Sequence, residues 1–314
     1  MTLRRVTSGL VLAALSVALA TPALLRPGWF GVPEFVADGR FGFGAGAAAL
    51  GAALLVLRRR RTALLALAAA TVHLAPAALL HVGVAPGAGD AALTVATVNL
   101  WYGNPDPARF VSFVDRHTPD VLAVLEVSPR FHPEVEGLAD RYPHRRIEVV
   151  SLPAPDTRLF GMGVLSRHPI RVFAPEVPVA GALPFLRATI AVDGREVDLL
   201  IPHVMPPQKS LDARHATFDV LAGAVDESRP TLLLGDLNAT SYSPSFGRLL
   251  AGAKLADSRR GFGRQPSWAP PGVPRPLGIA IDHVLHSAHF TVEDRFTGAP
   301  IGSDHLPVVA RLRW

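Results

Sequence analysis

Six short apolar stretches, all after residue 90, each run into an acid, an asparagine or a histidine, and this pattern constrains the fold more than any other feature of the chain. Runs of about four to eight residues rich in Val, Ile and Leu are typical of buried strands. A carboxylate or imidazole at the edge of a buried strand is costly unless another group pairs with it. These placements therefore predict that the strand ends converge on one polar site. The stretches are Leu93–Asn99, Val121–Glu126, Leu199–His203, Leu232–Asn238, Ile279–His283 and Gly302–Val309.

The elements between these stretches predict two sheets packed face to face with helices outside them. Apolar residues at helical spacing predict a helix over Pro107–His117, and a second helix is expected over Leu211–Val225. The pair Asp193-Gly194 is a strong turn signal between two strands, Phe185–Val192 and Arg195–Ile201. Many strands with few helices indicate one α/β domain over residues 90–314.

The first 89 residues differ in composition from the rest of the chain. The 314-residue sequence is 49% hydrophobic and 18% charged, and its mean hydropathy is +0.29, which is high for a soluble enzyme. Residues 1–89 contain eight arginines and two acids, whereas the remainder carries 23 basic and 24 acidic residues. The basic excess therefore belongs to the N-terminal segment, where membrane topology explains it better than nucleic-acid binding does.

Three apolar stretches make residues 1–89 a candidate membrane anchor of about three transmembrane helices: Val6–Leu25, Phe41–Leu57 and Thr62–Ala85. Two arginines precede the first stretch, and the block Arg58–Arg61 separates the second from the third. The positive-inside bias places both basic groups in the cytoplasm, and three crossings then place everything after the linker Pro86–Gly89 outside it. An even number of crossings would invert this conclusion.

Two other interpretations of the N-terminal segment remain open. Val6–Ala20 resembles the apolar region of a signal peptide, with Ala18-Leu19-Ala20 as a cleavage site. The second and third apolar stretches are also compatible with a buried helical hairpin of a soluble protein. An arginine block between two long uncharged stretches favours the membrane hairpin, and with it a multi-pass protein of the cytoplasmic membrane.

The polar residues at the ends of the stretches have the chemistry of a metal and phosphate site. The chain has no cysteine, which excludes disulfides, thiolate catalysis and Cys-ligated zinc. Hard oxygen ligands, the type that holds Mg²⁺, Mn²⁺ or Ca²⁺, are available instead. A hard cation beside histidine and asparagine donors suits phosphoester hydrolysis, because the metal and the donors stabilise charge on phosphoryl oxygens. The oxygen ligands are Asn99, Glu126, Asp236, Asn238 and Asp304.

Two histidines and one further acid complete the set. His203 and His305 can donate to an anionic substrate or exchange protons, and Asp282 can orient an imidazole. Taken alone, Gly-Asp-Leu-Asn is compatible with a turn and Ser-Asp-His with a surface loop. The combination and its order along the chain are much more specific.

This ordered set resembles the endonuclease/exonuclease/phosphatase superfamily, whose members include deoxyribonuclease I, abasic-site endonucleases, sphingomyelinases and inositol-polyphosphate 5-phosphatases. The resemblance covers about residues 92–314. It implies a four-layered α/β sandwich (DNase I-like), here preceded by the transmembrane segment, with the site at the strand ends. It also implies hydrolysis of phosphoesters with a divalent cofactor, Mg²⁺ or else Mn²⁺ or Ca²⁺, so residues 90–314 are expected to form the catalytic domain.

The resemblance assigns roles to residues by matching motif. The metal ligands are expected to be Glu126, Asp304, Asn99 and Asp236. The catalytic residues are expected to be His203, Asp236, Asn238, Asp282 and His305, with Asp282 orienting His305. The substrate phosphate is expected to contact Asn99, His203 and Asn238. Arg187 lies on a strand before His203, where a phosphate contact and an ordinary structural ion pair are equally compatible with the sequence.

Three functions fit these expectations. The first is a membrane-anchored phosphodiesterase or phosphatase that acts outside the cytoplasm on a phosphate ester. The second is an extracytoplasmic nuclease acting on DNA or RNA, which the near-neutral charge of residues 90–314 does not favour, because duplex binding normally uses several basic phosphate contacts. The third is a non-catalytic binding module, which has little reason to keep every polar residue of the set. The sequence does not indicate an oligomeric state.

Overall fold

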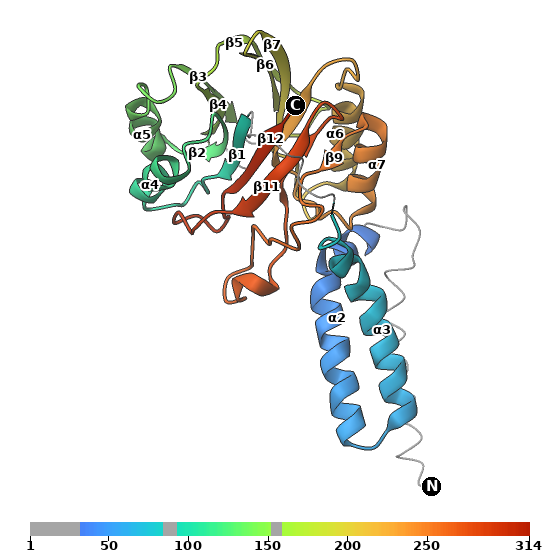
Figure 1. Cartoon of the computed structure of the whole chain (residues 1–314). Helices are drawn as coiled ribbons and strands as arrows, with labels where there is room; N and C mark the ends of the chain where they lie inside the picture. The colour runs from blue at the N-terminus through green and yellow to red at the C-terminus, as the bar shows by residue number, and fades with distance from the viewer. Residues whose placement is uncertain (1–31, 84–92, 152–158) are drawn as a thin grey trace.

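A computed structural model describes residues 32–83, 93–151 and 159–314 of the chain. Two sheets pack face to face with helices on their outer surfaces, and a pair of long helices projects from one end of this sandwich (Figure 1). The first predicted span, Val6–Leu25, and the linker Pro86–Gly89 lie outside the described residues.

Within the described part of the chain, the first sheet has the strand order β11-β12-β1-β2-β4-β3. β1 pairs in parallel with β2 and antiparallel with β12. The C-terminal ends of β1 and β2 therefore share an edge of the sheet with the start of β12. The strands are β1 (Leu93–Asn99), β2 (Val121–Val127), β3 (His144–Ser151), β4 (Leu159–Ser166), β11 (Thr291–Thr297) and β12 (Val308–Arg313).

The second sheet has the order β5-β6-β7-β8-β10-β9 among the described residues. β8 pairs in parallel with β7 and antiparallel with β10, so the end of β8 and the start of β10 lie together. The strands are β5 (Ile170–Glu176), β6 (Phe185–Val192), β7 (Arg195–Pro202), β8 (Thr231–Asp236), β9 (Ala256–Asp257) and β10 (Asp282–His286).

Helices cover the outer face of each sheet, which gives the predicted four-layered sandwich. α4 (Pro107–His117) and α5 (His132–Gly137) cover the first sheet, with α4 contributing Phe110 and Val114. α6 (Leu211–Gly223) and α7 (Pro244–Ala253) cover the second sheet through Phe218 and Phe246. A third group of buried side chains, mostly Val, Leu, Ile and Ala, fills the space between the two sheets.

Most of these elements were predicted from the sequence, but the position of the polar residues relative to the last two strands was predicted wrongly. The helix Pro107–His117 and the hairpin around Asp193-Gly194 are confirmed. Ile279–His283 and Gly302–Val309 were expected to be strands that end in polar residues, but Asp282 begins β10 and His305 lies in the loop before β12. Because β10 and β12 run antiparallel to their neighbours, their beginnings reach the same end of the sandwich as the ends of the parallel strands.

The projecting helices α2 (Val32–Val56) and α3 (Arg60–Leu79) pack closely along small residues. A Cβ atom on Gly44 would lie 2.7 Å from the Leu74 side chain, and one on Gly51 would lie 2.7 Å from that of Leu67. A side chain at either position would therefore displace the leucine that packs against the glycine. Small residues at the interface are typical of helix pairs in membranes, where close packing replaces the hydrophobic effect as the driving force.

Both projecting helices are long and apolar enough to cross a membrane, over Ala37–Val56 and Arg60–Leu79. Their outward-facing side chains include several large apolar ones, and Val56 and Leu79 are 82% and 66% exposed. The alternative of a buried soluble hairpin requires these side chains to be covered, whereas the helices lie away from the sandwich along most of their length (Figure 1).

α2 begins at Val32, well before the predicted Phe41, because its first turns bind the sandwich. The Asp38 carboxylate accepts hydrogen bonds of 2.8 Å from both the backbone N–H and the hydroxyl of Thr240. The Glu34 carboxylate accepts one of 3.0 Å from the backbone N–H of Ser245. The turn between α2 and α3, which contains the arginine block, lies at the opposite end of the hairpin (Figure 1).

Candidate active site

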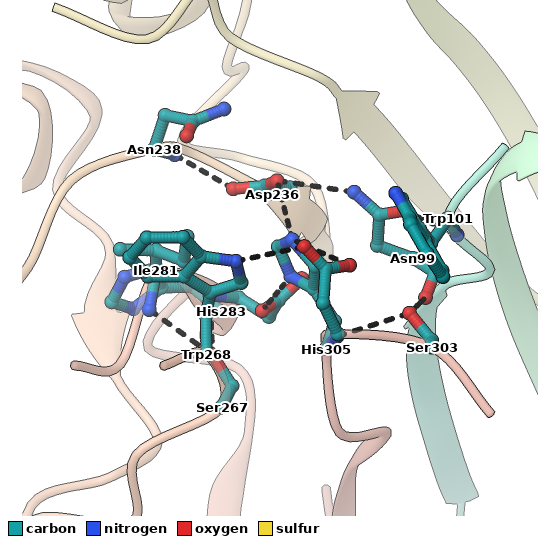
Figure 2. A network of polar contacts seen from close by, with 12 residues as sticks. Asn99, Trp101, Asp236, Asn238, Ser267, Trp268, Ile281, His283, Ser303 and His305 are labelled. Atoms are coloured by element: carbon teal, nitrogen blue, oxygen red, sulfur yellow. Dashed lines mark hydrogen bonds and ion pairs between the residues drawn. The ribbon is translucent and has the colours of Figure 1, made fainter. Parts of the chain in front are cut away.

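Polar residues from both sheets meet at one end of the sandwich, close to the start of α2. Asn99 and Asp236 end β1 and β8, Glu126 lies next to the end of β2, and Asp282 begins β10. His305 reaches the same place from the loop before β12. Figure 2 shows the side chains of Asn99, Asp236 and His305 directed toward one another.

The Asn99 amide joins two carboxylates. Its Nδ2 donates to Glu126 Oε1 at 3.0 Å and to Asp236 Oδ2 at 3.2 Å. Its Oδ1 accepts from the backbone N–H of Trp101 at 2.9 Å. These hydrogen bonds occupy Oδ1 and both Nδ2 hydrogens of Asn99 and hold its side chain between Glu126 and Asp236, and its metal and phosphate roles stay predictions.

Glu126 is held as an ionised carboxylate. Burial alone would raise its pKa, but the charge of His203 and hydrogen bonds from Asn99 and the backbone N–H of Tyr102 lower the pKa below its usual value. His203 Nε2 lies 3.6 Å from Glu126 Oε1. Glu126 has a φ of 54°, where the pairing of β2 with β4 shifts register. Left-handed backbone at a non-glycine residue is strained, and such strain is concentrated at functional sites.

His305 and Asp282 form a buried, charged pair. His305 Nδ1 lies 2.8 Å from Asp282 Oδ2. Burial opposes charge on the imidazole, yet the Asp282 carboxylate outweighs it and raises the pKa of His305 to about 10. The same interaction lowers the pKa of Asp282 despite its burial. At neutral pH His305 therefore carries a proton on Nε2, which lies 3.9 Å from Asp236 Oδ2.

Asp236 lies in an environment that suits a proton acceptor. Its side chain is fully buried, and burial together with the charge of Asp282 raises its pKa to about 6. Its Oδ1 accepts a 2.8 Å hydrogen bond from the backbone N–H of Asn238, which has a φ of 47°. A carboxylate with a pKa near neutrality accepts a proton more readily than an ordinary aspartate does.

The residues present fit a hard divalent cation. Asp304 Oδ2 accepts from Trp268 Nε1 at 3.0 Å, whereas Asp304 Oδ1 is buried with no hydrogen-bond partner among the described residues. That oxygen and the ionised Glu126 are the hard oxygen donors such an ion prefers. Asp236, Asp282 and His305 also present ligand atoms within 4.8 Å of one another. Within that cluster, Asp282 Oδ2 is already paired with His305 Nδ1 at 2.8 Å.

The structure does not bring Arg187 to this site. Its Nε donates to Glu176 Oε1 at 2.6 Å, and its Nη1 donates to the backbone oxygen of Ala224 at 3.1 Å. Arg187 thus ties β6 to β5 and to the end of α6. The sequence was also compatible with an ordinary ion pair for Arg187, and the structure contains that ion pair. Arg187 is therefore withdrawn as a phosphate contact.

Trp268, which lies between β9 and β10, also contacts the site. Besides its bond to Asp304, its backbone forms an isolated bridge with His305. The neighbouring Ser267 hydroxyl accepts 3.1 Å hydrogen bonds from the backbone N–H groups of Ile281 and Asp282. Ser267 and Trp268 therefore position Asp282 and Asp304 around His305.

Arg214 is a second residue that the sequence did not reveal. It lies on α6, is 0% exposed, and its Nη1 donates to the backbone oxygen of Asn238 at 2.7 Å. Its guanidinium also lies 3.6 Å from Glu34 of α2. The available signal was an arginine within the apolar face of a predicted helix, next to Thr217 and Phe218. Arg214 links the loop that holds Asp236 to the helical hairpin.

Comparison with known proteins identifies the fold. Residues 96–305 match the sequence profile described as the Endonuclease/Exonuclease/phosphatase family. The chain belongs to this family, whose members hydrolyse phosphoester bonds and are generally dependent on a divalent metal. A search of curated proteins finds no match to the sequence.

Solved structures with the same fold come from different branches of the family. An endonuclease/exonuclease/phosphatase from Beutenbergia cavernae is 22% identical, with 71% of this chain and 72% of that chain covered and a TM-score of 0.57. D. rerio TDP2 complexed with a single-strand DNA product is 18% identical, with 71% and 99% covered and a TM-score of 0.56. Sphingomyelinase C from Streptomyces griseocarneus is 21% identical, with 69% and 98% covered and a TM-score of 0.50.

Proposed function

We propose that this protein is a membrane-anchored phosphoesterase that hydrolyses a phosphodiester or phosphomonoester with a divalent cation, Mg²⁺ or else Mn²⁺ or Ca²⁺. The observation that carries the proposal is the buried cluster of Asp236, Asp282 and His305 beside the ionised Glu126. A site used only for binding has no need of a buried carboxylate whose pKa is raised to about 6 beside an imidazole whose pKa is raised to about 10.

In this mechanism Asp236 accepts a proton from the water that attacks phosphorus, and the backbone N–H of Asn238 holds the carboxylate in position. The new P–O bond forms as the bond to the leaving oxygen breaks. A cation held by Glu126 and Asp304 would supply Lewis-acid stabilisation of a phosphoryl oxygen. His305 donates from Nε2 to the developing negative charge.

The other donors of the site complete the phosphate contacts. Asn99 Nδ2 and His203 Nε2 both face the Asp236 carboxylate, at 3.2 and 3.8 Å. A substrate phosphate that enters beside Asp236 would accept hydrogen bonds from Asn99 Nδ2 and His203 Nε2 in place of these carboxylates, and donors at that position stabilise the charge that develops on phosphoryl oxygens. Asp282 keeps His305 protonated and oriented, so it acts through that imidazole.

The test of the proposed function is turnover by the purified full-length protein with Mg²⁺. Bis-p-nitrophenyl phosphate, plasmid DNA and phospholipid vesicles are assayed in parallel. We expect release of p-nitrophenol together with hydrolysis of one natural substrate. Plasmid nicking without lipid hydrolysis would assign the nuclease function instead. A protein that binds Mg²⁺ and hydrolyses none of the three would be a binding module, which contradicts the proposal.

The pH dependence of kcat/KM follows from Asp236 and His305. Asp236 must be ionised to accept a proton, so activity rises with pH as this carboxyl, with its pKa of about 6, loses its proton. His305 must stay protonated, which its pKa of about 10 ensures over the neutral range. A cation beside Glu126 shifts the acid limb to lower pH. We therefore expect half-maximal kcat/KM on bis-p-nitrophenyl phosphate at or below about pH 6 and a plateau above it, whereas activity that increases on acidification would exclude Asp236 as the base.

We further propose that the catalytic domain lies outside the cytoplasm. The apolar surface of the α2–α3 hairpin and its glycine-based packing support a membrane position for it. The arginine block at the hairpin turn lies at the end remote from the sandwich, and the positive-inside rule assigns that turn to the cytoplasm. This reasoning depends on the hairpin alone and not on the first predicted span.

Cysteine labelling tests this topology cleanly, because the natural chain has no cysteine. Val172→Cys places a thiol on the sandwich at a side chain that is 47% exposed, and Leu57→Cys places one at the hairpin turn at a side chain that is 67% exposed. A membrane-impermeant maleimide added to intact spheroplasts is expected to label Val172→Cys and to label Leu57→Cys only after lysis. The reverse pattern would place the catalytic domain in the cytoplasm.

A further inference from the structure

A cavity of about 580 Å³ lies between the first turns of α2 and the catalytic end of the sandwich. Its wall is mostly apolar and includes Phe41 and Phe43 of α2 together with Ile279 and Ile281 of the sandwich. At its inner end it reaches Asn238 and His305. The cavity therefore connects the proposed membrane helices to the proposed catalytic site, and neither part forms it alone.

Specific contacts hold the hairpin in place beside this cavity. The Asp38 carboxylate binds Thr240, and the Arg264 guanidinium stacks on the ring of Phe41. At the other helix, the backbone oxygen of Leu80 accepts hydrogen bonds of 2.9 and 3.0 Å from the N–H groups of Gly261 and Gly263. These contacts involve charged and backbone groups on both α2 and α3, so the cavity is a fixed feature of the interface.

The outer end of the cavity is lined by an apolar, proline-rich loop. Val273 and Leu277 line the cavity and are 38% and 50% exposed, and Leu277 ends the short helix η3 (Arg275–Leu277). Figure 1 shows this loop projecting from the same end of the sandwich as the hairpin. Large apolar side chains left half-exposed beside a membrane helix indicate contact with lipid rather than with water.

We propose that the cavity binds the hydrocarbon chain of a membrane lipid whose phosphoester lies at the catalytic residues, so that the substrate is a lipid phosphoester taken directly from the bilayer. The inference rests on the proposed function and names its substrate class. An occupant that fills the whole path must be apolar along α2 and must present a phosphate to His305 and Asn238. The bases of a nucleic acid can stack on the aromatic rings of the wall, but a hydrocarbon chain matches its aliphatic residues as well and brings no polar groups into it.

The test uses two p-nitrophenyl phosphodiesters that differ only in their second alcohol, ethyl or hexadecyl. Hydrolysis breaks the same P–O bond in both esters and releases the same p-nitrophenol. Both esters are assayed with the full-length protein in the same detergent micelles with Mg²⁺. Burial of even a few additional methylene groups corresponds to a preference of about 100-fold in kcat/KM for the hexadecyl ester. We expect the wild-type protein to show a preference of this order.

Two glycines of α2 provide a blocking variant and its matched control. Gly42 lines the cavity, whereas Gly46, one turn further along the helix, does not, and a Cβ at either position meets no atom within 4 Å. We expect Gly42→Phe to reduce the hexadecyl-to-ethyl ratio at least about tenfold, since most of the buried chain length is lost, and Gly46→Phe to keep the wild-type ratio. Leu277→Gln lies outside α2 and α3 and is expected to lower the ratio in the same direction. If Gly42→Phe does not fold, the ratio of the Leu277→Gln protein tests the lipid site.

The outcomes separate the two proposals. Metal-dependent turnover of both esters with a ratio near one, or a ratio that Gly42→Phe and Leu277→Gln leave unchanged, would overturn the lipid site and retain the phosphoesterase. Absence of metal-dependent turnover of either ester would overturn the phosphoesterase and the lipid site with it.

Discussion

Replacement of Asp236 by asparagine is expected to lower kcat on bis-p-nitrophenyl phosphate by about 10²- to 10⁴-fold, the range associated with loss of a general base. Asparagine has the same shape and its Oδ1 can still accept from the backbone N–H of Asn238. Its amide cannot take a proton from the attacking water. The loss is therefore expected in kcat, with little change in the circular dichroism spectrum, while the amide that replaces Oδ2 faces Asn99 Nδ2 and is expected to lower the thermal unfolding midpoint.

Asp193→Asn is the matched control for this substitution. Asp193 lies in the exposed turn between β6 and β7 and has a φ of 49°, a conformation that asparagine adopts readily. It removes the same charge far from the site, so kcat should remain within about twofold, because surface changes of this kind have small effects. An Asp236→Asn protein with more than a third of the control's activity would show that another group activates the water.

Replacement of Glu126 by glutamine is expected to weaken binding of Mn²⁺ by at least about tenfold and to lower turnover by about 10²- to 10³-fold at a fixed metal concentration. The substitution removes the negative charge that attracts the cation and replaces one of the two carboxylate oxygens by an amide nitrogen, which does not bind a hard cation. Its oxygen can still accept from the backbone N–H of Tyr102, so the strained backbone at this position keeps its support. Titration of Mn²⁺, followed by electron paramagnetic resonance of the free ion, measures the affinity directly.

Glu136→Gln is the control for the metal experiment. The Glu136 carboxylate is 71% exposed and pairs with Arg145 on the surface, an arrangement that contributes little to stability. It should bind Mn²⁺ and turn over substrate as the wild-type protein does. Equal Mn²⁺ affinity in the Glu126→Gln and Glu136→Gln proteins would remove Glu126 from the metal site and with it the assignment of Asp304 as its partner.

The sequence was sufficient to predict the sandwich and the convergence of its polar residues. Buried strands of Val, Ile and Leu are strongly patterned, and an unpaired acid at such a strand is costly enough to imply a partner. This reasoning located Asn99, Glu126 and Asp236 at the ends of β1, β2 and β8, where they share hydrogen bonds. The first apolar span and the boundary between anchor and domain lie outside the described residues and stay predictions.

The parts that could not be predicted depend on chain direction and on contacts between distant segments. Asp282 is the first residue of its strand and His305 precedes its own, because antiparallel pairing brings strand beginnings to the edge where the parallel strands end. Arg187 carries the same guanidinium whether it binds phosphate or Glu176, and only the tertiary structure distinguishes the two. The left-handed backbone at Glu126 has no local signal at all, since a β-bulge depends on the strand opposite.

The start of α2 binds the sandwich next to the proposed catalytic residues. Glu34 and Asp38 are the two acids of residues 1–89. In the structure they bind the segment from Thr240 to Ser245, which follows the loop of Asp236 and Asn238. Arg214 contacts both Glu34 and the backbone oxygen of Asn238. The helical hairpin is thus connected to the loop of Asn238 through buried polar groups, beyond its covalent link.

The most direct measurement is hydrolysis of bis-p-nitrophenyl phosphate by the purified full-length protein before EDTA treatment, after it, and after restoration of Mg²⁺ or Mn²⁺, with the Asp236→Asn protein as the blank. We expect turnover to fall to the level of the blank in EDTA and to return when the cation is restored. Turnover that persists unchanged in EDTA, or a metal-restored protein no more active than the blank, would contradict a metal-dependent phosphoester site at these strand ends.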